Sequence, residues 1–244
     1  IAVQADARLT AEALTDTGNR PGTEADAWRT AFRVDMDSLL VERAEEAQIA
    51  TLPMHPRRAL AEIRETLPKD AIVTLDTGNT CLQAADRLAH YAPLSLITPL
   101  DFGLVGFGLA AAIGAKAAAP DRPVVAIMGD GAIGYTMIEI QTAIQHGLPI
   151  VVVVLDNEAW GAEKAYQQEF YGGRLLGAEI QSPRYDKFAE LCGGQGIWVN
   201  GPGDMGPALD QALSSGKTTI IQGKIDPKAL MTLRKDLFKA PDAG

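Results

Sequence analysis

Continuous apolar runs are the feature of this sequence that most constrains its fold. "VVAIMG" at 124–129 and "PIVVVVL" at 149–155 consist of apolar residues, several of them β-branched. Such runs favour strands that are buried on both faces, as in parallel sheets. Further strand-like runs alternate with segments of helical spacing and cover residues 71–76, 94–99, 196–200 and 218–224. This alternation predicts an α/β protein with a doubly wound, mainly parallel sheet and helices on both faces.

Three parts of the chain differ in pattern. Residues 52–230 carry the regular alternation, and we assign them to one domain. Residues 1–51 contain a strand-like start at 1–7, a turn rich in Gly, Pro, Asp and Thr, and a charged helix. We expect this part to be the tail of a preceding central domain plus a linker helix, because it is too small to bury its own core. Residues 231–244 are expected as a polar C-terminal tail.

The composition narrows the class of partner. The formal net charge is −9, which argues against nucleic acid or an anionic membrane surface as the main partner. Apolar residues make up 47% of the chain, enough to fill the core of a globular domain. Cys81 and Cys192 lie in no metal-binding or redox motif, so we expect two thiols in a reducing cytoplasm.

Acidic and amide side chains follow two of the predicted strands. Asp130 follows the first run, and Asp156 and Asn157 follow the second. The carboxyl ends of parallel strands meet at one edge of a sheet, where doubly wound folds bind their ligands. Carboxylate and amide oxygens are ligands that Mg²⁺ prefers, and Mg²⁺ commonly joins carboxylates to phosphates. The pattern therefore predicts a metal ion held by Asp130, by Asn157 and by a backbone carbonyl at Ala159.

Glycines around Asp130 suit an anionic ligand. Gly129 and Gly131 let the backbone come close to a ligand. The N–H groups of Gly131 and Ala132 would face a phosphate at the start of the next helix. A metal ion would remove the repulsion between Asp130 and that phosphate. The alternative is that Asp130 and Asn157 only cap the helices that follow them.

Three stretches resemble the thiamine-diphosphate-dependent enzymes. Gly-Asp-Gly at 129–131, followed after about 25 residues by an Asn-containing pair, resembles their metal–diphosphate motif. "DFGLVGFGLAAAIGAK" at 101–116 is similar to the aminopyrimidine-binding segment of the acetolactate-synthase-like branch, and "DTGNT" at 76–80 resembles the loop over the diphosphate. The resemblance implies that 52–230 are the C-terminal, diphosphate-binding domain, with thiamine diphosphate and Mg²⁺ as cofactors. The pair at 156–157 reads Asp-Asn, where many relatives have Asn-Asn.

The same resemblance assigns roles to individual residues. Gly103 would accept a hydrogen bond from the aminopyrimidine through its carbonyl, and Val105 would be the apolar wedge that bends the cofactor. These two positions are the catalytic ones in this chain, and Asn79 is the expected diphosphate contact. The implied cofactor-binding set is Asn79, Thr80, Gly103, Val105, Gly129, Gly131, Ala132, Asn157, Trp160 and Gly161.

The stretch at 160–180 gives a finer resemblance. "WGAEKAYQQEFYGGRLLGAEI" looks like sulfoacetaldehyde acetyltransferases more than acetolactate synthases. This implies an acyl transferase that cleaves a C–C or C–S bond and converts sulfoacetaldehyde and phosphate into acetyl phosphate and sulfite. An acetolactate-synthase-like enzyme or a 2-oxo acid decarboxylase is the alternative. Lys164 or Arg174 would pair with a sulfonate or phosphate, or else belong to a solvated helix face.

The resembling enzymes activate the cofactor with a Glu from a separate pyrimidine-binding domain, usually supplied across a dimer interface. No such domain precedes Ile1 in this sequence. We therefore expect the chain alone to be catalytically incomplete. It would need a pyrimidine-binding domain or second subunit and would assemble as a homodimer or tetramer. The alternative that is not an enzyme is a non-catalytic cofactor-binding subunit or a fragment.

A dinucleotide-binding domain is the competing enzyme interpretation. "GFGLAA" at 106–111 fits the G-x-G-x-x-A fingerprint, and Asp130 follows at a strand end near the ribose-binding position. The fingerprint should follow a strand directly, whereas "TPLDFGLV" at 98–105 intervenes. This interpretation also does not explain the pair at 156–157.

Overall fold

The computed structural model describes residues 4–16, 22–99 and 101–231, and it contains two compact units, 1–45 and 46–244. Helix α1 spans Ala7–Asp16 and helix α2 spans Thr23–Glu46, which confirms the predicted charged helix. The strand predicted for 1–7 is wrong where the chain is described, and residues 1–3 lie outside the described part. Asp6 instead precedes α1 and caps its N-terminus, because its carboxylate accepts a hydrogen bond from the Leu9 N–H at 3.0 Å.

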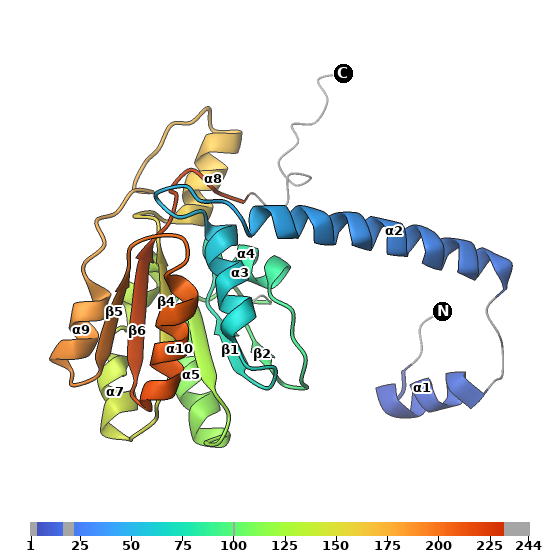
Figure 1. Ribbon diagram of the computed structural model, residues 1–244, viewed down its shortest axis with the longest axis horizontal. Helices are drawn as coiled ribbons and strands as arrows, with labels where there is room; N and C mark the ends of the chain where they lie inside the picture. The colour runs from blue at the N-terminus through green and yellow to red at the C-terminus, as the bar shows by residue number, and fades with distance from the viewer. Residues whose placement is uncertain (1–3, 17–21, 100, 232–244) are drawn as a thin grey trace. The chain divides into compact units, whose positions relative to one another are not determined.

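Six parallel strands form one sheet in the second unit (Figure 1). Their order across the sheet is β2-β1-β3-β4-β6-β5, and every neighbouring pair is parallel. The strands are β1 (Ile72–Leu75), β2 (Leu96–Ile97), β3 (Val124–Gly129), β4 (Val151–Asp156), β5 (Gln195–Val199) and β6 (Thr219–Lys224). The parallel α/β sheet predicted from the apolar runs is confirmed.

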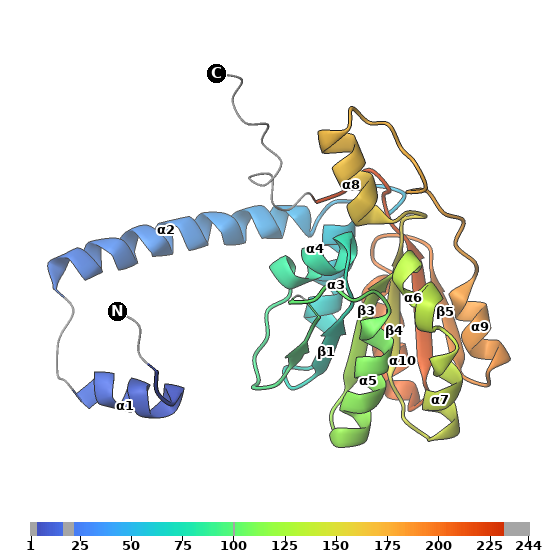
Figure 2. The ribbon, with the colours of Figure 1, turned by 180° about the vertical axis from the view of Figure 1, so that it is seen from behind.

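Helices cover both faces of this sheet, as predicted (Figures 1 and 2). One face packs against α3 (Pro56–Thr66), α4 (Asn79–Arg87) and α10 (Met205–Ser215). The other face packs against α5 (Phe107–Ala118), α6 (Asp130–Thr136), α7 (Glu139–Gln145) and α9 (Tyr185–Leu191). The remaining helix of the second unit that the structure describes, α8, spans Gly161–Phe170.

Successive residues of the central strands pack into opposite cores. Val125 and Ile127 of β3 belong to one cluster of buried residues, and Ala126 and Met128 belong to the other. Side chains alternate between the two faces of a strand, and helices bury both faces here. The strand therefore reads as one continuous apolar run.

The direction of winding reverses beside β1. From β1 the chain passes through α4 to β2 at the edge of the sheet, and then through α5 to β3 on the other side of β1. The two connecting helices lie on opposite faces of the sheet. Such a reversal leaves a crevice outside the carboxyl ends of the two strands. Asp76 and Asp130 follow these two strands in the sequence.

The stretch "GYTMIEIQTAIQHG" at 134–147 predicts one helix, but the structure has two there, α6 and α7, separated at Met137 and Ile138. Helix α6 also begins earlier, at Asp130, directly after β3. Helix α8 lies in the stretch after 157, where the sequence allowed a helix around Lys164. Within the described ranges, no helix combines the length and the apolar character that crossing a membrane requires.

The close packing of β5 on α9 yields a stability prediction. A Cβ at Gly196 would overlap the backbone carbonyl of Asp186, so Gly196→Ala should lower the free energy of unfolding by roughly 1–3 kcal/mol. Gly114 in α5 is the matched control, because its Cβ would meet nothing within 4 Å. Gly114→Ala should stabilise the protein by about 0.5–1 kcal/mol. Urea unfolding measures both changes, and equal midpoints for the two variants would contradict this packing.

Candidate cofactor and metal site

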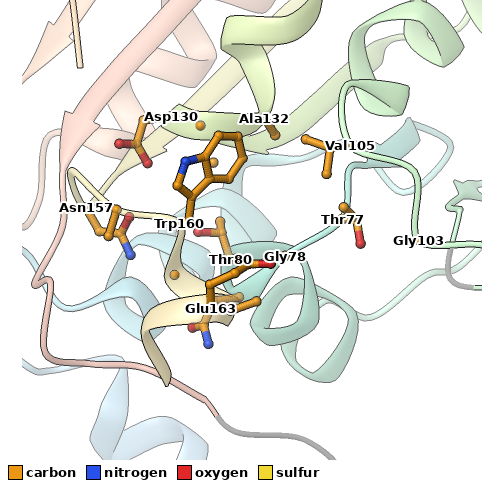
Figure 3. A pocket seen from close by; sticks show the side chains of 16 residues that line it. Thr77, Gly78, Thr80, Gly103, Val105, Asp130, Ala132, Asn157, Trp160 and Glu163 are labelled. Atoms are coloured by element: carbon orange, nitrogen blue, oxygen red, sulfur yellow. The ribbon is translucent and has the colours of Figure 1, made fainter. Parts of the chain in front are cut away.

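A single cavity brings together all the predicted cofactor-binding and metal-binding residues (Figure 3). It opens at the carboxyl ends of β1, β3 and β4, beside the point where the winding reverses. Its predicted lining residues are Asn79 and Thr80 after β1, Gly103 and Val105 before α5, Gly129, Asp130, Gly131 and Ala132 at the end of β3, and Asn157, Ala159, Trp160 and Gly161 after β4. Thr77, Gly78, Ala162 and Glu163 also line it. The prediction placed Thr77 and Gly78 in the loop at 76–80 but gave none of these four residues a role of its own.

Asp130 is a buried carboxylate with an unequal environment at its two oxygens. Only 1% of the residue is exposed. Its Oδ2 accepts a hydrogen bond from Ser182 Oγ at 2.5 Å, whereas its Oδ1 is buried and has no hydrogen-bond partner among the described residues. The pKa of Asp130 is raised to about 6, chiefly by burial and also by the nearby Asp156, although the Ser182 hydrogen bond lowers it. The carboxylate therefore lacks the compensation that an ionised buried group needs.

Asn157 lies beside Asp130 on the same side of the cavity (Figure 3). The two residues follow β3 and β4, which are neighbouring parallel strands. The backbone N–H of Asn157 also lies close enough to lower the pKa of Asp130, although it makes no hydrogen bond with Oδ1. The two strand ends thus place a carboxylate and an amide together at one point of the cavity wall.

Asp156 is bound to residues outside the cavity lining. Its Oδ2 accepts a hydrogen bond from Gln222 Nε2 at 2.8 Å and lies 3.0 Å from Lys224 Nζ. Its Oδ1 accepts a hydrogen bond from the backbone N–H of Glu158 at 3.1 Å. Asp156 is fully buried and ties β4 to β6, so its role is to hold the turn that carries Asn157.

The turn after Asn157 is held against residues 178–180. The N–H of Trp160 donates to the Ala178 carbonyl at 2.8 Å, and the N–H of Ile180 donates to the Glu158 carbonyl at 3.0 Å. Neither hydrogen bond uses the carbonyl of Ala159, the residue between these two. The Ala159 backbone is therefore fixed at the cavity while these bonds leave its carbonyl oxygen unused.

Two of the predicted glycines are required by close packing inside the site. A Cβ at Gly131 would lie 2.8 Å from the indole ring of Trp160. A Cβ at Gly161 would lie 3.0 Å from Asn157 Nδ2 and 3.0 Å from the Cβ of Asn79. Any side chain at either position would displace a residue that lines the cavity.

The Asn79 side chain is bonded to the end of the described chain. Its Nδ2 donates to the Met231 carbonyl at 2.5 Å, and its Oδ1 accepts from the Met231 N–H at 3.1 Å. Gln83 adds a hydrogen bond to the Ala229 carbonyl at 3.0 Å. A contact between the Asn79 amide and a diphosphate, as the sequence predicted, requires this pairing to open.

Three helices begin at the cavity without a side-chain cap. These are α4, α6 and α8, whose N-cap residues are Gly78, Gly129 and Trp160. At the start of α10, by contrast, Glu62 accepts hydrogen bonds from the N–H groups of Met205 and Gly206. The first-turn N–H groups of a helix have no partner within it, and an uncapped N-terminus attracts anions. The cavity therefore gathers N–H donors that suit an anionic ligand.

Asp76 occupies the place where a dinucleotide would have to bind. Its carboxylate accepts hydrogen bonds from the N–H groups of Gly106 at 2.9 Å and Gly108 at 2.6 Å. Burial raises the pKa of Asp76, and these N–H groups oppose that effect. The N–H groups of the two glycines in the G-x-G-x-x-A match thus already donate to a carboxylate of the same chain. A pyrophosphate at the N-terminus of α5 would meet this negative charge, which argues against the dinucleotide interpretation.

Neither of the two predicted anion-binding cations lines the cavity. Lys164 is buried, and its Nζ lies 3.1 Å from Glu179 Oε1. Its position on α8 is therefore not a solvated helix face, and its charge is already paired. Arg174 is exposed and follows α8 in the loop before α9.

The fold and this cavity define a cofactor-binding domain of the doubly wound α/β class. The family model described as "Thiamine pyrophosphate enzyme, C-terminal TPP binding domain" matches residues 76–222. The chain belongs to this family of thiamine-diphosphate-dependent enzymes. The resemblance predicted from the Gly-Asp-Gly turn and the stretches at 76–80 and 101–116 is thereby confirmed.

Several named relatives share this region. The sulfoacetaldehyde acetyltransferase of Alcaligenes xylosoxydans xylosoxydans is 36% identical over 231 residues, which are 90% of this chain and 38% of that protein. The acetolactate synthase large subunit IlvG of Mycobacterium tuberculosis is 32% identical over 236 residues, which are 95% of this chain and 42% of that protein. The chain thus spans about two fifths of the length of these curated relatives.

A solved structure agrees with the sequence comparison. The Rhodococcus jostii RHA1 thiamine diphosphate-dependent 4-hydroxybenzoylformate decarboxylase superimposes with a TM-score of 0.66 at 28% identity. The superposition covers 72% of this chain and 33% of the other.

The residues at the cavity fit a divalent cation bound to a diphosphate. Among the residues that the structure describes, no group of three or more His, Cys, Asp and Glu side chains is placed to hold a metal by itself. The donors would therefore be mixed: the unpartnered Oδ1 of Asp130, the amide oxygen of Asn157 and the carbonyl of Ala159. All are hard oxygen ligands of the kind Mg²⁺ prefers, and Mg²⁺ takes its remaining ligands from phosphate and water.

Metal-free protein should be stabilised by Asp130→Asn. The folded-state pKa of Asp130 lies above its ordinary value, so ionising this buried carboxylate destabilises the folded protein as the pH rises from about 4 to 6. With EDTA at pH 7, the free energy of unfolding of the variant should exceed that of the parent protein by roughly 1–3 kcal/mol. Well below pH 3.8, the ordinary pKa of an aspartic acid, Asp130 is protonated in both states and the difference should vanish. Thermal unfolding at both pH values checks this, and a less stable variant at pH 7 would contradict it.

Proposed function

We propose that this chain binds the diphosphate and Mg²⁺ of thiamine diphosphate in an acyl transferase that cleaves a C–C or C–S bond. The reaction that we favour converts sulfoacetaldehyde and phosphate into acetyl phosphate and sulfite. The observation that carries the cofactor assignment is the buried, unpartnered Oδ1 of Asp130 beside Asn157, in a cavity where three uncapped helices begin. The similarity to sulfoacetaldehyde acetyltransferases supports the choice of substrate.

Each part of the cavity has its own task in this proposal. Asp130, Asn157 and the Ala159 carbonyl hold the metal, and the backbone at Gly131 and Ala132 binds the diphosphate. The Gly103 carbonyl orients the aminopyrimidine, and Val105 sets the bend of the cofactor. When bound, thiamine diphosphate supplies the nucleophilic carbon and the electron sink for cleaving a bond next to a carbonyl. Trp160, packed on Gly131, shields this end of the cavity from water.

A pyrimidine-binding domain or second subunit completes the site in this proposal. Exposed apolar side chains lie next to the cavity: Phe102 and Leu104 flank the lining residue Gly103, and Tyr135 and Ile138 follow its lining residue Ala132. The two segments touch, because Thr136 Oγ1 donates to the Gly106 carbonyl at 3.2 Å. Exposed apolar side chains on neighbouring segments suit a protein interface. We accordingly propose a homodimer or tetramer, in the cytoplasm, with a small-molecule substrate.

Asp130→Ala should abolish Mg²⁺-dependent binding of thiamine diphosphate. The variant removes the only carboxylate among the proposed protein ligands, so the protein would hold Mg²⁺ and its diphosphate with neutral oxygen ligands alone. Isothermal titration with the cofactor, with and without Mg²⁺, measures the loss. Asp121→Ala is the matched control, because Asp121 is exposed and precedes β3 at the opposite end of the sheet. Full affinity in the Asp130 variant would remove this residue from the metal site.

The substrate is tested by following two products. With thiamine diphosphate, Mg²⁺ and a pyrimidine-binding domain present, sulfoacetaldehyde and phosphate should yield sulfite and acetyl phosphate in equal amounts. The 244-residue chain alone should yield neither, because the activating Glu is supplied by the other domain. CO₂ release from pyruvate without sulfite release would favour the acetolactate-synthase-like or decarboxylase alternative. Cofactor binding without any turnover in the complete mixture would favour a non-catalytic subunit.

A further inference from the structure

Residues 182–186, at the start of α9, contact the end of β3 and side chains of β5 and β6. Ser182 Oγ donates to Asp130 Oδ2 at 2.5 Å, and Tyr185 OH donates to the backbone carbonyl of Asp130 at 2.8 Å. One contact thus fixes the side chain of Asp130, and the other fixes its backbone. Both contacts come from a segment more than 50 positions away in the sequence.

Gln222 on β6 anchors this segment to the sheet. The residue is 1% exposed. Its Oε1 accepts from the N–H of Tyr185 at 2.7 Å and from the N–H of Asp186 at 3.3 Å. Its Nε2 donates to Asp156 Oδ2 at 2.8 Å and to the Pro183 carbonyl at 3.0 Å. The amide therefore uses all its donors and acceptors, and a fully satisfied buried network of this kind is rigid.

An ion pair holds the same segment from its outer side. Arg184 makes two hydrogen bonds with the buried Asp186, from Nε to Oδ1 at 2.7 Å and from Nη2 to Oδ2 at 2.6 Å. The Arg184 guanidinium also lies over the Trp198 ring of β5, 4.1 Å from its centre. Because the segment is fixed on β5 and β6, Ser182 is presented to Asp130 from a rigid support.

The position of Ser182 decides which carboxylate oxygen remains available. A carboxylate that rotates freely presents either oxygen, and binding a cation then costs the entropy of ordering it. Here Ser182 engages Oδ2, and Oδ1 is left without a partner. Hydrogen bonds to the second oxygen of a metal-binding carboxylate orient it in this way and change metal affinity substantially.

We propose that Ser182 and Tyr185 are positioning residues, which orient the Asp130 carboxylate so that its Oδ1 binds the divalent cation. Gln222 links this segment to Asp156 through hydrogen bonds, and Asp156 in turn holds the turn that contains Asn157. This inference rests on the proposed metal role of Asp130 and Asn157. It adds the requirement that residue 182 carries a hydroxyl group, although this residue is not a metal ligand.

Binding of Mn²⁺ in the presence of thiamine diphosphate tests this without any turnover. Electron paramagnetic resonance measures free Mn²⁺ and the spectrum of bound Mn²⁺ for the full 244-residue chain. Ser182→Ala should weaken Mn²⁺ binding by about 10–100-fold and broaden the bound signal, because Asp130 loses its fixed orientation. Ser182→Thr, which keeps the hydroxyl, should restore the affinity. Tyr185→Phe should also weaken binding, because the Asp130 backbone loses a hydrogen bond.

Ser215→Ala is the matched control. Ser215 Oγ donates to the Ala212 carbonyl at 2.8 Å at the end of α10, so the variant removes a comparable hydrogen bond away from the cavity. It should bind Mn²⁺ like the parent chain, and thermal unfolding without metal should show that Ser182→Ala is folded. Equal Mn²⁺ affinity of Ser182→Ala, Ser182→Thr and the parent would overturn the positioning role alone. Absence of cofactor-dependent Mn²⁺ binding in the parent chain would overturn the proposed function itself.

Discussion

Burial of negative charge at the carboxyl ends of β1, β3 and β4 is the constraint on which this site depends. An ionised carboxylate removed from water is costly unless charges or hydrogen bonds compensate it. The Asp76 carboxylate accepts hydrogen bonds from the N–H groups of Thr77, Gly106 and Gly108. The Asp156 carboxylate accepts a hydrogen bond from Gln222 and forms an ion pair with Lys224. Asp130 receives one hydroxyl from Ser182, and its second oxygen has no partner within the described chain. The least compensated carboxylate is the one that lines the cavity, which is where a cation would stabilise the protein most.

The helices that begin at the cavity have the opposite need, because the N–H groups at their N-termini have no side-chain acceptor. Carboxylates neutralise the N-termini of α5 and α10, whereas α4, α6 and α8 begin at the cavity without a side-chain cap. A cation alone would satisfy Asp130 and repel these N-termini, and an anion alone would do the reverse. A metal ion that carries a diphosphate satisfies both deficits together. The negative net charge of the chain is therefore compatible with an anionic cofactor, because the local field at the cavity differs from the overall one.

The strands and the cavity residues were predictable because their signals are local. Buried parallel strands appear as continuous apolar runs, and Gly-Asp-Gly at 129–131 is a contiguous motif. The residues that support the site were not predictable. Ser182 and Gln222 are ordinary polar residues in sequence, and their partners Asp130 and Asp156 lie 52 and 66 positions away. The sequence assigned no role to Asp156, whose carboxylate the structure places outside the cavity lining, against Gln222 and Lys224 on the neighbouring strand.

The cavity specifies its cofactor more closely than its substrate. Its lining contains Asp130 and Glu163 but no Lys or Arg, so a sulfonate or a 2-oxo acid carboxylate finds no cation among these residues. Lys164 on α8 is already paired with Glu179. In the proposed assembly, a cation that recognises an anionic substrate would come from the pyrimidine-binding domain or second subunit. Relatives named for an acetyltransferase, a synthase and a decarboxylase activity all match this region, as expected if the shared part binds the cofactor while the added part selects the substrate.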